Sequence, residues 1–375
     1  MRIASVEVIP YALPFREPYV TAVGTLTRRE MVLLRLRSAD GLEGLGEAVP
    51  LSLRGGAALA QVVEELERLG RLDELDEATL RGKATGLSPP ARCAALTALL
   101  DLRGRRAASG PSPPSRSSFQ PLSERNDDRD AGGVWCNATL IAGDPSSVVS
   151  AAERWAADGF STFKLKLGTG DEAAQVRAVR EALGPRARIR VDANAAWDVE
   201  TAKRVLGELE PYEVELAEQP VATLEESMEV ARSTAIPLAG DESIESRDDA
   251  ERAAAMEACQ MTGIKLSKVG GPEAAIEIAE VLPAYISSAL DGPAGIAAAA
   301  QVAATLAEAA SASDSDPAPG PDERLDLAHG LATQRLFAST IASTECELRG
   351  DMLHPPPGPG LGVEIDEAAL QEHRL

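Results

Sequence analysis

The sequence predicts an α/β protein in which a closed barrel of parallel strands follows a separate α+β block. Through the second half of the chain, short apolar segments alternate with amphipathic, alanine-rich stretches. This alternation is typical of parallel strands joined by helical crossovers. In the first hundred residues, strand-like segments come before helix-like ones, as in α+β domains. A length of 375 residues suits one large barrel or two ordinary domains.

The N-terminal block begins with strands. Ile3–Leu13 alternates loosely between apolar and polar residues, Met31–Leu36 is a dense apolar run, and Gly41–Ala48 is expected to end a hairpin. Ala58–Leu69 and Pro90–Arg105 then have the apolar spacing of helices. The block therefore has its strands first and its helices after them.

The second half contains eight segments that we expect to be strands. They are Trp135–Leu140, Thr162–Leu167, Ile189–Asp192, Val214–Glu218, Pro237–Asp241, Met261–Leu266, Ala284–Ser288 and Leu325–Ala328. Eight strands with seven helices between them favour a closed barrel. An open nucleotide-binding sheet is the alternative, but no GxGxxG motif follows the first strand.

Two stretches interrupt these patterns, residues 109–133 and 311–321, both rich in Ser, Pro and Asp. Such composition buries little apolar surface, so we expect connections there. The predicted organisation is an α+β domain over residues 1–108, a linker over 109–133, a barrel over 134–344 and a C-terminal tail over 345–375.

Composition excludes several classes of function. The net charge of −22, with no basic patch, disfavours nucleic acids and anionic membranes as partners. We find no transmembrane stretch and no signal-peptide core at the N-terminus, and therefore expect a cytoplasmic protein. The four cysteines are far apart and form no CxxC motif, which favours free thiols over disulfides or a zinc site.

Charged residues stand at the ends of five consecutive predicted strands, at nearly constant intervals. In chain order they are Lys164 with Lys166, Asp192, Glu218, Asp241 and Lys265. Any one of them alone could be a helix cap or a solvated lysine. Five in register are harder to explain in that way, because the carboxyl ends of barrel strands converge on one mouth, where unpaired charge is costly.

The residue types at this mouth indicate a metal-assisted proton transfer. Three carboxylates without histidine or cysteine form an all-oxygen ligand set, which suits Mg²⁺, with Mn²⁺ possible. A lysine beside a divalent cation and a second lysine should have a lowered pKa and can act as a base. We therefore expect removal of a proton α to a carboxylate, with the metal stabilising the enediolate.

In this order, the motifs FKLKLG, VDANAAW, EQP, GDES and IKLSKVGG resemble the enolase superfamily, muconate lactonizing enzyme subgroup. The resemblance covers nearly the whole chain. It implies a (β/α)7β TIM-like barrel and an α+β capping domain built from the N-terminal block and the C-terminal tail. It also implies that Asp192, Glu218 and Asp241 bind Mg²⁺. The three histidines, His329, His354 and His373, do not supply the His–Asp pair of the mandelate racemase branch.

The resemblance also implies roles for the lysines. Lys166 would be the base, Lys164 would hold the substrate carboxylate, and Lys265 would lie on the opposite face. Asn194 is expected to hydrogen-bond Asp192, whereas Glu242 and Lys268 could be neighbours of the site or surface ions.

Shorter motifs, Cys136–Leu140, Ser287–Asp291 and Ala328–Thr333, resemble o-succinylbenzoate synthases. That family dehydrates 2-succinyl-6-hydroxy-2,4-cyclohexadiene-1-carboxylate in menaquinone synthesis. N-acylamino acid racemase or dipeptide epimerase activity, with Lys166 and Lys265 on opposite faces, is the alternative. Dipeptide epimerases carry Asp-x-Asp where this chain has Ala328-His329-Gly330. A non-catalytic binding protein is more remote. A small-molecule carboxylate is the expected partner, and a homo-oligomer is possible.

Overall fold

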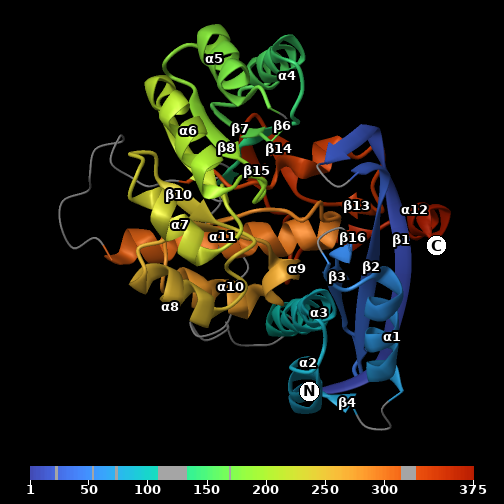
Figure 1. Cartoon of the computed structure of the whole chain (residues 1–375). Coiled ribbons are helices and arrows are strands. Elements are labelled where there is room, and N and C mark those ends of the chain that lie inside the picture. The colour runs from blue at the N-terminus through green and yellow to red at the C-terminus, as the bar shows by residue number, and fades with distance from the viewer. Residues whose placement is uncertain (22–23, 53–54, 72–74, 109–132, 169, 314–326) are drawn as a thin grey trace.

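The computed structural model describes residues 1–21, 24–52, 55–71, 75–108, 133–168, 170–313 and 327–375 (Figure 1). Nearly all of the predicted linker over residues 109–133 and most of the predicted connection over 311–321 lie outside the described residues. None of the described helices is long and apolar enough to cross a membrane.

In the described part of the N-terminal block, a four-stranded antiparallel sheet is accompanied by three α-helices. The strand order is β3-β2-β1-β4. The strands are β1 (Arg2–Thr21), β2 (Gly24–Ser38), β3 (Glu43–Ala48) and β4 (Leu75–Asp76), and the helices are α1 (Leu59–Gly70), α2 (Glu77–Ala84) and α3 (Pro89–Ala108). Helices α1 and α3 begin and end within three residues of their predicted bounds.

Strand β2 is buried on both faces, which explains its dense apolar run. Met31 and Leu33 belong to the core shared with the barrel, whereas Val32 and Leu34 belong to the core beneath α1 and α3. Alternate residues of a strand point to opposite faces, so a strand between two cores must be apolar throughout. Helix α3 lies so close to β3 that a Cβ at Gly46 would be 2.0 Å from the carbonyl oxygen of Ala94.

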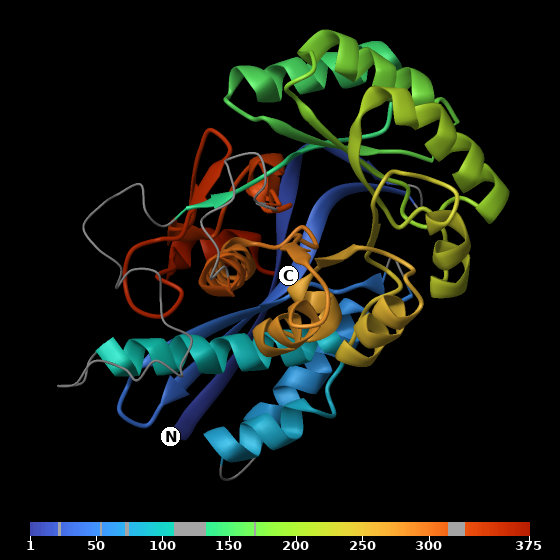
Figure 2. The ribbon, with the colours of Figure 1, turned by 90° about the vertical axis from the view of Figure 1, so that its left-hand side faces the viewer.

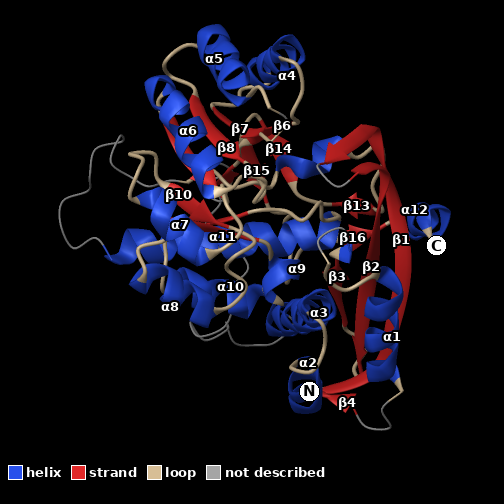
Figure 3. Ribbon diagram, viewed as in Figure 1, coloured by secondary structure: helices blue, strands red, loops and turns tan. Residues whose placement is uncertain are grey.

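The second half forms a curled parallel sheet of seven strands in the order β12-β11-β10-β9-β8-β7-β6. Its helices lie on the outer side of the strands (Figures 2 and 3). The strands are β6 (Ala138–Leu140), β7 (Thr162–Lys166), β8 (Arg188–Asp192), β9 (Val214–Glu218), β10 (Leu238–Gly240), β11 (Met261–Ile264) and β12 (Ala284–Ile286). The helices are α4 (Pro145–Ala157), α5 (Glu172–Leu183), α6 (Val199–Leu209), the 3₁₀ helix η3 (Glu210–Tyr212), α7 (Leu224–Ala231), α8 (Arg247–Ala255), α9 (Leu266–Val269), α10 (Pro272–Ala279) and α11 (Pro293–Ser313).

The segment around His329 and Gly330 joins the two edges of this sheet. The amide of Gly330 donates to Ile286 O at 2.8 Å, and the amide of Asn137 donates to His329 O at 2.9 Å. The closing pairs are therefore isolated bridges at residues 329 and 330. We expected the eighth strand at Leu325–Ala328, which is too early; its first two residues lie outside the described part of the chain.

The predicted first barrel strand, Trp135–Leu140, is two strands. Strand β5 (Val134–Trp135) pairs with the tail, and only β6 enters the barrel sheet. After a 3₁₀ helix, η4 (Ala332–Leu336), the tail contains β13 (Ala342–Thr344), β14 (Glu347–Arg349), β15 (Met352–His354), β16 (Glu364–Ile365) and α12 (Glu367–His373). The amide of Leu375 donates to Pro10 O at 3.0 Å, so the tail ends beside β1.

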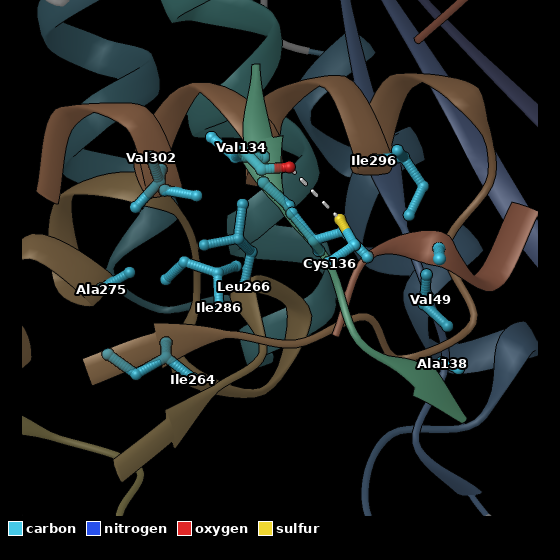
Figure 4. Close-up of a cluster of buried hydrophobic side chains, with 14 of the residues drawn as sticks. Val49, Val134, Cys136, Ala138, Ile264, Leu266, Ala275, Ile286, Ile296 and Val302 are labelled. Carbon is cyan, nitrogen blue, oxygen red and sulfur yellow. Dashed lines mark hydrogen bonds between the residues drawn. The ribbon is translucent and has the colours of Figure 1, made fainter. Parts of the chain in front are cut away.

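One large apolar core connects the barrel to its neighbours. Figure 4 shows part of it, where Val134 and Cys136 pack near Ile286 of β12 and Ile296 of α11. Val49, from the end of the N-terminal sheet, belongs to the same cluster. The N-terminal block is thus packed onto the barrel through shared buried surface.

Candidate active site

Five consecutive strands deliver the predicted site residues to one end of the barrel. Lys164 and Lys166 lie on β7, Asp192 and Glu218 are the last residues of β8 and β9, and Asp241 and Lys265 directly follow β10 and β11. The strands are parallel, so their carboxyl ends share one mouth.

The strand-end carboxylates do not cap the helices that follow them. Helices α6, α7 and α8 are capped instead by the side chains of Asp198, Thr223 and Ser246. The alternative explanation of these acidic residues as caps of the following helices is therefore excluded.

Lys164 and Lys166 hold the first two carboxylates. The Nζ of Lys164 lies 2.8 Å from Asp192 Oδ2 and 2.5 Å from Glu218 Oε2, and the Nζ of Lys166 lies 2.6 Å from Asp192 Oδ2. Asp192 is fully buried and Glu218 almost so. These four predicted residues form one network of charge-assisted hydrogen bonds.

Asp241 is held by two other lysines. Lys265 contacts its Oδ2, and Lys268 lies 3.0 Å from its Oδ1 and also donates to Ile244 O at 2.9 Å. Lys268 is therefore a buried partner of Asp241 and not a surface ion, which settles one of the two roles left open by the sequence.

The network shifts the acidity of its members in opposite directions. Burial alone would lower the pKa of Lys164, but the charges of Asp192 and Glu218 raise it above its usual value. Burial lowers the pKa of Lys166 to about 8, against the attraction of Asp192. Burial opposes ionisation of Asp192, yet the neighbouring lysines keep the pKa of this carboxyl far below its usual value.

Asn194 and Glu242 link the cluster around Asp192 to the segment that carries Asp241. The backbone amide of Asn194 donates to Asp192 Oδ1 at 2.9 Å, as expected. The side-chain oxygen of Asn194 accepts a hydrogen bond from Lys166 Nζ at 2.9 Å. Its Nδ2 lies 3.2 Å from Glu242 Oε1. Lys166, Asn194 and Glu242 therefore form a chain of hydrogen bonds from β7 to the segment after β10.

Two contacts at the site were missed by the sequence analysis. The side-chain oxygen of Gln219 accepts from the amide of Asp241 at 2.7 Å, and the hydroxyl of Tyr285 contacts Glu218 Oε2. The position of Gln219 directly after Glu218 was one available signal. Gly263 was another, because a glycine inside a strand often marks a close approach.

The carboxylates fit a hard divalent cation. Oε1 of Glu218 is buried and has no hydrogen-bond partner among the described residues, which is unusual for an oxygen of this kind. Within the same part of the chain, no three acidic, histidine or cysteine side chains are close enough together to hold a metal ion, and lysines contact all three carboxylates. An all-oxygen donor set that includes one buried oxygen without a hydrogen-bond partner among the described residues suits Mg²⁺ better than zinc.

Two family matches cover most of the chain. Residues 3–110 match the mandelate racemase / muconate lactonizing enzyme N-terminal domain, and residues 147–369 match the family described as enolase C-terminal domain-like. The chain belongs to the enolase superfamily, muconate lactonizing enzyme subgroup. The family resemblance seen in the sequence is thus confirmed, and so is the predicted fold class.

Members of this subgroup with different activities are similar to the chain. An o-succinylbenzoate synthase of Thermobifida fusca is 38% identical over 63% of this chain and 69% of its own length. The structure of a muconate lactonizing enzyme from Pseudomonas fluorescens, complexed with muconolactone, matches with a TM-score of 0.83, 28% identity and coverage of 100% and 99%. A dipeptide epimerase from Enterococcus faecalis, complexed with Mg and L-Leu-L-Tyr, matches with a TM-score of 0.82, 25% identity and coverage of 97% and 100%.

Proposed function

We propose that this enolase-superfamily enzyme removes a proton α to a carboxylate of a small molecule, using Lys166 as the base. The observation that carries the proposal is the position of Lys166. Its Nζ lies at the mouth, 2.6 Å from Asp192 Oδ2 and 2.9 Å from Asn194 Oδ1. These two hydrogen bonds orient the lysine side chain. When the amine is neutral, its lone pair is available to take a proton from a substrate.

We further propose that the substrate is 2-succinyl-6-hydroxy-2,4-cyclohexadiene-1-carboxylate and that the product is o-succinylbenzoate. The synthase of Thermobifida fusca, at 38% identity, supports this substrate. The end of the barrel at residues 328–330 supports it as well. A free dipeptide carries an ammonium group that needs a carboxylate, whereas this segment reads Ala-His-Gly. Burial lowers the pKa of His329 to about 3, and its Nδ1 accepts from the Ile286 amide at 2.9 Å.

Lys166 and Lys265 would have different roles in the reaction. Lys166 takes the proton from the carbon next to the carboxylate, and the electron pair of the broken carbon–hydrogen bond moves into the carboxylate. When the carbon–oxygen bond to the hydroxyl breaks, Lys166 returns the proton and the hydroxyl leaves as water. The ring becomes aromatic, which makes the step favourable. Lys265 remains protonated and stabilises the negative charge of the enediolate.

Asp192, Glu218 and Asp241 would hold Mg²⁺, with Mn²⁺ as a possible substitute. The bound ion would supply positive charge beside the substrate carboxylate. The resemblance implies that Lys164 holds the substrate carboxylate, and that role stays a prediction. In the structure, its ammonium contacts the carboxylates of both Asp192 and Glu218.

An assay with three arms tests the substrate. Purified protein with Mg²⁺ is given the cyclohexadiene carboxylate, followed by absorbance; N-acylamino acids and dipeptides in D₂O, followed by NMR; and cis,cis-muconate, followed by loss of its absorbance. The proposal expects fast dehydration with slow α-proton exchange. Exchange with inversion but no dehydration would identify a racemase or epimerase. Turnover of muconate alone would identify a cycloisomerase.

Removal of the metal tests the cofactor separately. Excess EDTA should abolish dehydration, and added Mg²⁺ should restore it. Unchanged activity in EDTA would disprove the metal requirement while leaving the role of Lys166 open to its own test.

A further inference from the structure

Tyr285 reaches across the inside of the barrel to a proposed metal ligand. It lies on β12, is fully buried, and packs with Leu216, Ala239, Met261 and Leu327 in a small apolar cluster. Its hydroxyl donates to Oε2 of Glu218, which ends β9. The contact therefore joins two strands that are not neighbours in the sheet.

Gly263 provides the space for this ring. It is the register partner of Tyr285 on the neighbouring strand β11. A Cβ at position 263 would lie 3.0 Å from both Cζ and the hydroxyl oxygen of Tyr285. A side chain at position 263 would require the Tyr285 ring to shift by a few tenths of an ångström, so the glycine matches the position of the ring.

Arg190 fixes the ring from another side. Its guanidinium carbon lies 5.3 Å from the ring centre of Tyr285, a cation–π contact. Arg190 is itself held by Ala328 O at 2.6 Å and by Glu215 Oε2 at 2.5 Å. The position of the tyrosine hydroxyl is thus set by packing on several sides.

The result is an asymmetric Glu218 carboxylate. Oε2 accepts from both Lys164 and Tyr285, whereas the buried Oε1 has no partner among the described residues. Two donors on one oxygen fix the rotation of the carboxylate and determine where the other oxygen points.

We propose that Tyr285 is a positioning residue that orients Glu218 so that its Oε1 is presented to the divalent cation. This inference rests on the proposed function, because it takes Glu218 as a metal ligand. In this role Tyr285 acts through the Glu218 carboxylate and does not itself bind the metal or the substrate.

The test is the Mg²⁺ affinity of the full-length protein without substrate, measured by isothermal titration calorimetry and by Mn²⁺ electron paramagnetic resonance. Tyr285→Phe should weaken binding about tenfold or more, as the loss of such supporting hydrogen bonds usually does. Tyr11→Phe is the matched control, because Tyr11 is also fully buried and also donates to a buried glutamate, Glu47, at 2.9 Å. It should leave the Mg²⁺ affinity unchanged.

A second variant covers the case in which Tyr285→Phe does not fold. Gly263→Ala keeps the hydroxyl but places a methyl group 3.0 Å from it, so the ring must shift by a few tenths of an ångström, and Mg²⁺ binding should also weaken. If folded Tyr285→Phe or Gly263→Ala binds Mg²⁺ as tightly as the unmodified protein, the positioning role is wrong and the proposed function stands. If the unmodified protein binds no Mg²⁺, both are wrong.

Discussion

Glu47 and Gly292 are joined by a hydrogen bond of 2.6 Å, from the Gly292 amide to Glu47 Oε1, although 245 residues separate them. Glu47 comes from β3 of the N-terminal sheet, and Gly292 directly precedes α11 of the barrel. The carboxyl group of Glu47 thus accepts a hydrogen bond from the amino end of a helix in another part of the fold, where backbone amides have no partner within the helix. A Cβ at Gly292 would lie 2.2 Å from the hydroxyl of Tyr11, so glycine is required for this approach.

Stability should depend on pH through Glu47. Burial, and then the charge of Asp291, raise the pKa of Glu47 from 4.5 to about 8, against the hydrogen bonds from Tyr11, Gly292 and Gly295. Burial also raises the pKa of Asp291. The folded protein therefore keeps a proton that the unfolded chain loses above its lower pKa. The free energy of unfolding should fall as pH rises from about 5 to about 8, by up to about 1.4 kcal/mol per pH unit for one such group.

Glu47→Gln removes the carboxyl group that titrates at position 47, and with it that group's contribution to the pH dependence of stability. Its thermal unfolding midpoint should vary less across that pH range than the midpoint of the unmodified protein. Glu43→Gln, on the same strand but paired at the surface with Arg37, is the control and should keep the slope. An equal slope in Glu47→Gln would show that Glu47 is ionised in the folded state throughout.

Lys166→Ala should abolish turnover with the fold intact. The base contributes about 10²–10⁴-fold to such reactions, and no other lysine reaches both Asp192 Oδ2 and Asn194 Oδ1 among the described contacts. The measurement is kcat on the preferred substrate, with circular dichroism to check folding. Lys203→Ala, which loses a surface pair with Glu229, should remain fully active. Retained turnover in Lys166→Ala would refute the assignment of the base.

Lys265→Arg separates a dehydratase from a racemase. Arginine keeps the positive charge beside Asp241 but does not give up a proton near neutral pH. If Lys265 only stabilises charge, dehydration should persist at a reduced rate, because the guanidinium is larger than the ammonium. If Lys265 exchanges a proton, α-proton exchange from its face should vanish. Both rates are measured on the same preparation, so misfolding would lower them together.

The regular spacing of the strands made most of the site predictable. The strand-end positions of Asp192, Glu218 and Asp241 follow from a repeat of strand and helix, and parallel strands place their ends together whatever their side chains are. The dense run in β2 was predictable for a similar reason, since burial on both faces leaves no polar alternation.

What the sequence could not supply are contacts between strands that are not neighbours. Tyr285 meets Glu218 across the barrel, and Glu47 meets Gly292 across two halves of the chain, so neither pair has a local spacing to detect. The closing strand was placed too early because His329 and Gly330 pair through isolated bridges without the apolar run of a full strand.

Lys268→Met should destabilise the protein through Asp241. The Nζ of Lys268 contacts the backbone oxygen and Oδ1 of Asp241 and donates to Ile244 O at 2.9 Å, and the side chain is buried. Methionine keeps much of the apolar stem but removes the ammonium that donates to Ile244 O, to Asp241 O and to Asp241 Oδ1, of which Asp241 O keeps the Ile244 amide at 3.1 Å. Such losses cost about 3 kcal/mol in buried pairs. Urea unfolding should show this decrease, whereas Lys203→Met, which removes an ion pair with Glu229 at the surface, should change the free energy of unfolding far less. Equal stability of the two variants would mean that Lys265 alone satisfies Asp241.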